Sequence, residues 1–269
     1  MKETKTLAEG IAKLRYENLP EPAVWAAKQR VLDWLGAALH GSQEQPARIL
    51  RETVLPTDGA TDATLFGTNR QRAAAMHAAF LNGAASCAAA ESDEKLAALV
   101  SPAFSVAEKE HKSGRELLAA IAAGAELAAR LGEAENSAGK VAAASAARAL
   151  GLSPEQTAQV LCLADAQTSG AKGMLRAGKA CYDGVLSAYL AQAGFTDGTE
   201  ETGCGAKVLA AQEPCRAFAA NAAAWEKSRA RFLPLAAPVV GDEKANRLAA
   251  WAETLDEAED VSATLREIL

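Results

Sequence analysis

The sequence LNGAASCAAAESDE spans residues 81–94. It continues an alanine-rich run that starts at Gln71, passes through Asn82-Gly83 and ends in an acidic cluster. Alanine has the highest helix propensity and buries little area per residue. The run from 71 to 90 therefore predicts a buried central helix that packs closely against its neighbours.

The rest of the chain has the same character. Apolar residues recur at helical spacing, and the only extended piece we expect is short, at residues 63–67. Helices are predicted to start at Thr4 and to span 23–40, 47–54, 102–109, 113–131, 139–150, 155–168, 177–193, 208–211, 216–231, 244–254 and 261–269. The predicted fold class is all-α, with no fixed-period repeat.

Composition restricts the classes of function. Hydrophobic residues make up 49% of the 269 residues and aromatic residues only 5%, so we expect a core with leucine and valine layers rather than aromatic ones. The net charge is -6 and no basic stripe is present, which argues against nucleic acid as a partner. The apolar stretches are too short or too interrupted to predict a membrane span. The first residues lead into an amphipathic helix rather than a signal sequence, so we expect a cytoplasmic protein.

The cysteines and histidines predict no cofactor or metal centre. Five cysteines without paired spacing argue against a disulfide framework, and the three scattered histidines give no zinc pattern. Cys87 lies among alanines with no histidine nearby, so we interpret it as a small buried side chain rather than a nucleophile. His77 lies within the alanine-rich run, and the default interpretation is a core or interface histidine.

Several segments resemble one family in a common order. They are LRYENLP (14–20), VLDWLG (31–36), SGRELLAAIAAGAE (113–126), ARALGLSPEQ (147–156), LAQAGFT (190–196) and RFLPLA (231–236). Together with residues 81–94 they resemble the MmgE/PrpD family of 2-methylcitrate dehydratases, cis-aconitate decarboxylases and iminodisuccinate epimerases. The resemblance implies a helical domain, a homodimer formed through it, and a small di- or tricarboxylate as ligand.

The resemblance also implies a missing part. In the family, the last helices return to the helical domain after a separate mixed α/β lid. Here the interpretation is a single helical domain over 1–269, with an N-terminal block (1–196), a short connection in place of the lid (197–224) and returning C-terminal helices (225–269).

The family's site residues can be placed only in part. In register from Asn82, the family's histidine falls on Cys87 and its first two acidic residues fall on Ala90 and Ser92, which leaves Asp93. The family's lysine falls near Gly173, one residue from Lys172.

The candidate catalytic residues are therefore Asp93 and Lys172. Arg176 lies one helical turn after Lys172 and is the candidate for binding a substrate carboxylate. The plainer alternatives are a helix cap or solvated loop for Asp93, and surface charge for Lys172 and Arg176.

Three functions follow from this pattern. The first is a degenerate family member that has lost the ancestral dehydratase or decarboxylase activity and acts as a helical binding or scaffolding protein. The second is a lyase or isomerase that acts on a small carboxylic acid with an altered site. The third is a subunit of a full-length paralogue.

Overall fold

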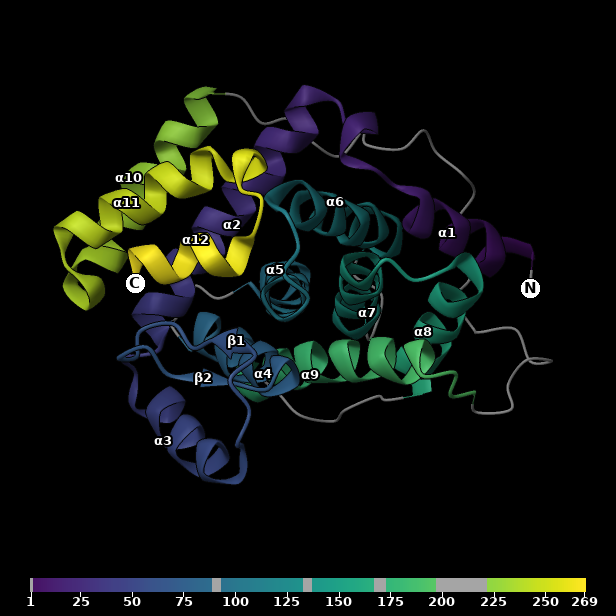
Figure 1. Cartoon of the computed structure of the whole chain (residues 1–269), viewed down its shortest axis with the longest axis horizontal. Coiled ribbons are helices and arrows are strands. Elements are labelled where there is room, and N and C mark those ends of the chain that lie inside the picture. Colours follow the sequence, from purple (N-terminus) through teal and green to yellow (C-terminus); the bar gives the residue numbers. More distant parts are fainter. Residues whose placement is uncertain (1, 89–92, 133–136, 167–172, 197–221) are drawn as a thin grey trace.

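A computed structural model describes residues 2–88, 93–132, 137–166, 173–196 and 222–269 (Figure 1). The described residues form an all-α fold with a single two-stranded hairpin, which confirms the predicted fold class. The α-helices are α1 (Lys2–Lys13), α2 (Glu21–Gly41), α3 (Gln45–Val54), α4 (Ala75–Ser86), α5 (Glu94–Lys109), α6 (Gly114–Leu131), α7 (Ser137–Leu150), α8 (Pro154–Ala166), α9 (Gly173–Gln192), α10 (Ala222–Val240), α11 (Asp242–Glu253) and α12 (Val261–Ile268). Short 3-10 turns lie at Tyr16–Asn18 (η1), Leu55–Thr57 (η2) and Leu255–Glu257 (η4).

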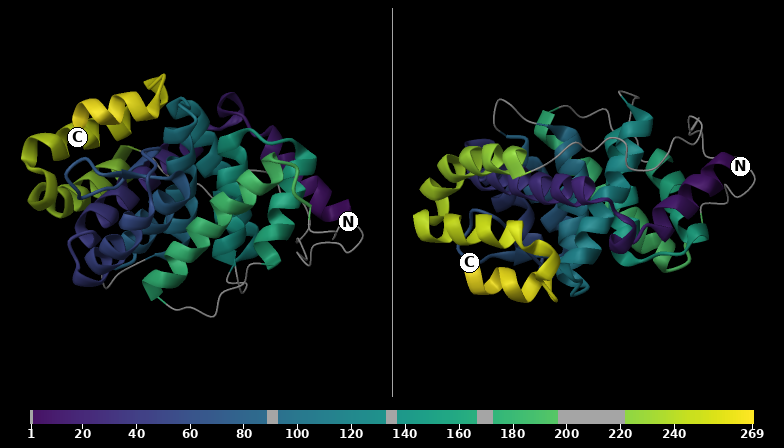
Figure 2. Two further views of the ribbon diagram at one scale, coloured as in Figure 1. Left: turned by 60° about the horizontal axis from the view of Figure 1, so that its bottom comes forward. Right: turned by 90° about the horizontal axis from the view of Figure 1, so that it is seen from above.

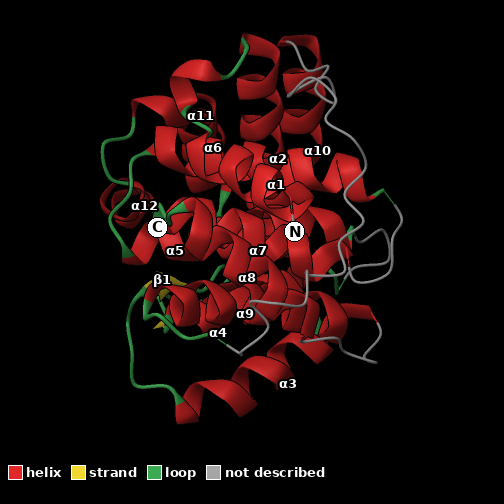
Figure 3. Ribbon diagram, turned by 90° about the vertical axis from the view of Figure 1, so that its right-hand side faces the viewer, coloured by secondary structure: helices red, strands yellow, loops and turns green. Residues whose placement is uncertain are grey.

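Helix α5 lies at the centre of the molecule. Figure 1 shows α6 on one side of it and α4 and α9 on the other, with α7 alongside. Helix α7 packs against α5, α6 and α9, and α4 packs against α5 and α9. Helix α3 lies at the outer edge beyond α4 and α9 (Figures 1 and 3), where it contacts α4 and η2.

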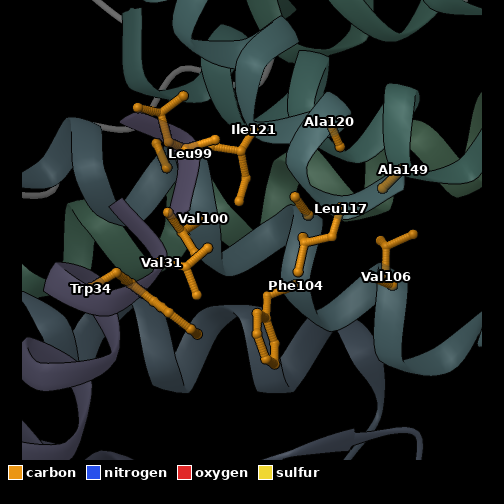
Figure 4. Packing of buried hydrophobic residues seen from close by; sticks show 14 of the residues in the cluster. Val31, Trp34, Leu99, Val100, Phe104, Val106, Leu117, Ala120, Ile121 and Ala149 are labelled. Atoms are coloured by element: carbon orange, nitrogen blue, oxygen red, sulfur yellow. The ribbon is translucent and has the colours of Figure 1, made fainter. Parts of the chain in front are cut away.

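The core contains more aromatic packing than the composition suggested. The ring centroids of Trp34 and Phe66 lie 5.3 Å apart, as do those of Trp34 and Phe104. Phe104 also contacts Trp251, with 6.1 Å between centroids. Figure 4 shows Trp34 and Phe104 beside the aliphatic residues of α2, α5 and α6. The rest of the core is mainly alanine, leucine and valine, as expected, and the few aromatic residues gather at one junction.

Glycines bring α4 and α9 into close contact. A Cβ atom on Gly178 would lie 2.8 Å from the Phe80 carbonyl oxygen and 3.0 Å from the Ala84 Cβ. A Cβ atom on Gly83 would lie 2.6 Å from the Cys181 sulfur. The close packing predicted from the alanine-rich sequence therefore depends on glycine where the two helices cross.

The alanine-rich helix is shorter than predicted. Residues Ala63–Thr64 (β1) and Arg72–Ala73 (β2) form an antiparallel hairpin, so α4 begins only at Ala75. The buried carboxylate of Glu108 holds this hairpin: it accepts hydrogen bonds from the Thr64 backbone N–H (2.8 Å), the Thr64 hydroxyl (2.7 Å) and Arg72 (3.2 Å). The pairing depends on a residue distant in sequence, which periodicity does not show.

Two predicted helix boundaries were wrong because prolines lie inside the helices. We expected a helix to start at Pro102, but α5 starts at Glu94 and Pro102 lies inside it. Helix α10 continues to Val240 with Pro234 and Pro238 inside, beyond its predicted end at 231. The helix predicted at 208–211 lies outside the described residues.

The C-terminal helices pack on the N-terminal block. Helix α10 packs against α2, α11 against α10 and α2, and α12 against α5. Figure 2 shows these helices gathered at one end of the molecule, with α1 at the other. Most of the connection proposed at 197–224 lies outside the described residues. No described helix has both the length and the apolar character that a membrane span requires.

Candidate functional site

The residues that align with the family's site gather where α4 ends, α5 begins and α9 begins. Cys87 follows the last residue of α4 and is buried. Burial is the main reason that the pKa of its thiol rises to about 11, and the charges of Glu94 and Asp93 raise it further. The thiol is therefore protonated at neutral pH, whereas nucleophilic cysteines react as thiolates. Its burial agrees with the interpretation of Cys87 as a core residue.

Asp93 caps helix α5. Its Oδ1 atom accepts hydrogen bonds from the backbone N–H groups of Lys95 (2.9 Å) and Leu96 (3.2 Å). A helix N-terminus leaves such groups without partners within the helix, and an aspartate at the cap satisfies them. The structure thus gives Asp93 a structural role at the end of the segment that was aligned with the family's site.

Arg176 binds Glu94, the residue that follows Asp93 in the chain. Its Nη2 lies 2.7 Å from Glu94 Oε2, and its Nε donates to Glu94 Oε1 at 3.1 Å. The hydrogen bond and charge of Glu94 raise the pKa of Arg176. The guanidinium that was predicted to bind a substrate carboxylate therefore binds a carboxylate of its own chain. Lys172, the second candidate catalytic residue, lies outside the described residues.

Two charged residues of α2, Arg30 and Asp33, also lie in this region and were not predicted from the sequence. Burial lowers the pKa of Arg30, although the charges of Asp33 and Asp93 act to raise it. Asp33 binds Arg231 of α10 at 3.2 Å. Burial raises the pKa of Asp33, and hydrogen bonds and charges from Ser228, Arg231 and Arg30 only partly offset that effect. Arg30 and Asp33 are three positions apart, which places them on one face of a helix. This spacing could have indicated a charged pair, but the surrounding residues form a strongly apolar stripe.

The acidic side chains of this region are paired with other groups of the same chain. Asp33, Asp93 and Glu94 each accept hydrogen bonds or an ion pair from described groups of the chain. Among the described residues, no group of three His, Cys, Asp or Glu side chains could hold a metal ion. In this region the described side chains thus hold helix ends together and brace α2 against α10.

The family model for the MmgE/PrpD N-terminal domain matches residues 5–207, about three quarters of the chain. The chain belongs to the MmgE/PrpD family. The match ends before α10, so the likeness of residues 231–236, the return of the helices at 225–269 and the loss of the family's lid stay predictions. No curated protein matches the chain.

Proposed function

We propose that this MmgE/PrpD-family protein has lost the ancestral lyase chemistry and acts as a helical binding or scaffolding protein. The observation that carries the proposal is the two-point contact between Arg176 and Glu94. In a carboxylate-processing site, a guanidinium at this place would be expected to hold the substrate. Here an internal carboxylate takes that position.

The remaining groups support the same conclusion. Proton abstraction next to a carboxylate needs a positioned base within hydrogen-bond reach of the substrate. Asp93 is fixed at the start of α5 by two backbone hydrogen bonds. The thiol of Cys87, where the family has a histidine, is buried and protonated at neutral pH. Neither group matches an available general base.

The proposal includes a homodimer formed through the helical domain. Leu175 on α9 and Phe195 just after it are large apolar side chains that are about half exposed, at 50% and 48%. Light scattering coupled to gel filtration measures the mass directly. A monomer at micromolar concentration would remove the dimer from the proposal without affecting the loss of lyase activity.

The test of the lost activity is a turnover assay with 2-methylcitrate, cis-aconitate and iminodisuccinate, with a full-length MmgE/PrpD-family enzyme as positive control. The expected result is no product above background. Turnover at a rate like that of the full-length enzyme would overturn the proposal.

A slower reaction that disappears in Asp93→Asn, Lys172→Met and Arg176→Gln would instead support an altered lyase or isomerase. Repeated co-purification with a full-length paralogue would support the role of a subunit.

A further inference from the structure

A cavity of about 340 Å³ lies between α3, α4 and α9, near the start of α4, whereas Cys87 follows the end of α4. Its walls are formed by Thr53, Val54, Thr57, His77, Phe80, Lys179 and Tyr182. The volume falls in the range of small-molecule sites. His77 and Cys87 are separated by ten positions, which is about 15 Å along a helix axis. On α4 the cavity thus lies well away from Cys87, whereas on α9 its Lys179 follows Arg176 by one helical turn.

The imidazole of His77 is held in one orientation. Its Nδ1 lies 2.8 Å from Asp58 Oδ2. The Asp58 side chain is only 4% exposed, and it also accepts hydrogen bonds from the backbone N–H groups of Ala60 (2.9 Å) and Ala74 (2.8 Å). Burial raises the pKa of Asp58, but these three donors outweigh it and the pKa is lowered. An ionised Asp58 assigns the Nδ1 proton to the Asp58 contact and leaves Nε2 for the cavity.

Tyr182 adds a second polar group. Its ring stacks on His77 with centroids 5.8 Å apart and meets Phe80 edge-on at 6.4 Å. Tyr182 is partly exposed, and its hydroxyl has no hydrogen-bond partner within the described part of the chain. The aromatic wall thus carries an unused hydroxyl.

Lys179 adds a third polar group. Its Nζ donates to both carboxylate oxygens of Asp183, at 2.5 and 2.6 Å, and the Asp183 side chain is almost fully buried. An ammonium group has three N–H donors, so one remains for a ligand. Lysine, histidine and tyrosine thus line one cavity whose other walls include Val54 and Phe80.

A second histidine–aspartate pair in the same chain lacks these surroundings. His111 Nδ1 lies 2.9 Å from Asp260 Oδ2, but the His111 side chain is 62% exposed and lies in a turn after α5. The pair fixes the turn to the start of α12, where Asp260 caps the helix. A histidine–aspartate contact alone therefore does not mark a site; the cavity, the hydroxyl and the ammonium distinguish His77.

We propose that this cavity binds a small monocarboxylate with an apolar body, such as an aryl or short alkyl acid. The carboxylate would accept hydrogen bonds from the Lys179 ammonium and the Tyr182 hydroxyl, and the ammonium contact is charge-assisted. The His77 imidazole lines the same cavity beside them. The apolar body would lie against Val54 and Phe80. The apolar walls disfavour a second or third carboxylate, which would lose its hydration without a partner.

The test uses benzoate as the probe, with benzyl alcohol and benzylamine as matched controls of charge. Affinities are measured by calorimetry, and the imidazole resonances of the three histidines are followed by NMR. Benzoate is expected to bind at least tenfold more tightly than the alcohol or the amine, and to shift His77 while His111 stays unchanged. Equal binding of all three probes, tighter binding of the alcohol, or no movement of His77 at millimolar benzoate would overturn the proposal.

Two variants locate the binding. Tyr182→Phe removes only the hydroxyl and is expected to weaken benzoate binding about tenfold. Val54→Phe fills the cavity and is expected to abolish it, provided that its thermal melt shows a folded protein. Tyr189→Phe is the matched control on the same helix, because Tyr189 bonds Glu110 and does not line the cavity. Unchanged affinity in Tyr182→Phe and Val54→Phe, or an equal loss in Tyr189→Phe, would contradict this location.

Discussion

The two ends of α4 differ in how the polar groups around them are used. At one end, where the family's site would lie, Asp93 caps α5 and Arg176 binds Glu94. At the other end, the Tyr182 hydroxyl and the Nε2 atom of His77 line a cavity. Family membership points to the first end, whereas the free hydrogen-bonding capacity lies at the second. The position of a family's site in the sequence therefore does not show where this chain can still bind a ligand.

Both ends depend on the close crossing of α4 and α9. Gly178→Ala would place a Cβ atom 2.8 Å from a backbone oxygen of α4, so one helix must move. We expect a loss of about 1–3 kcal/mol in the free energy of unfolding and weaker benzoate binding. Gly139→Ala is the control, since its nearest atom would be 4.0 Å away. Urea unfolding should show no loss for it; equal losses in both variants would contradict the role of the crossing.

Asp58 gives the cavity end a stability that depends on pH. The pKa of Asp58 is lowered in the folded protein, so its stabilisation is complete above its ordinary pKa of 3.8 and is lost as pH falls through the lower folded value. Asp58→Asn should cost about 1–2 kcal/mol at neutral pH and flatten the acid limb of the stability curve.

Asp183 is expected to have the opposite effect on how stability depends on pH, because its pKa is raised rather than lowered. Burial raises its pKa in spite of Lys179, so its contribution falls as pH rises above 3.8. Above pH 3.8, the free energy of unfolding of Asp183→Asn should therefore fall less with rising pH than that of the parent chain. Urea unfolding across pH separates the two, and identical slopes for both variants would contradict the assignment.

At the family-site end, the capping role of Asp93 predicts a specific pattern. Asp93→Ala should cost about 1 kcal/mol, because two backbone N–H groups lose their acceptor, whereas Asp93→Ser should retain most of the stability. Thermal or urea unfolding measures both variants. An alanine variant as stable as the parent chain would show that the cap contributes nothing.

The smallest effect is expected at Arg176. Its side chain is 54% exposed, so the ion pair with Glu94 is screened by solvent. Arg176→Gln should cost less than about 0.5 kcal/mol, and less still at high salt. Lys179→Gln on the same helix should cost several times more, since it leaves the buried Asp183 without its partner. A reversed order would break the comparison between the two ends.

The sequence predicted the helices better than the site. The helix starts predicted at 113 and 155 lie within one residue of the observed starts of α6 and α8. In the structure, Ser113 and Glu116 form a capping box at the start of α6. The start of α5 agrees with the alternative that made Asp93 a helix cap, although the predicted helix began only at Pro102. The hairpin before α4 could not be predicted, because the distant residue Glu108 holds it through contacts that periodicity does not encode. The cavity was missed for the same reason: Val54, His77 and Tyr182 come from three separate helices.

The most direct test of the difference between the two ends is an NMR titration of the folded protein with cis-aconitate at millimolar concentration. Because Asp93, Glu94 and Arg176 are engaged with their own chain, the backbone amides near Cys87, Asp93 and Arg176 should not shift in a saturable way. Saturable shifts centred on those three residues would show that the family's site still accepts its ligand, and would contradict the account.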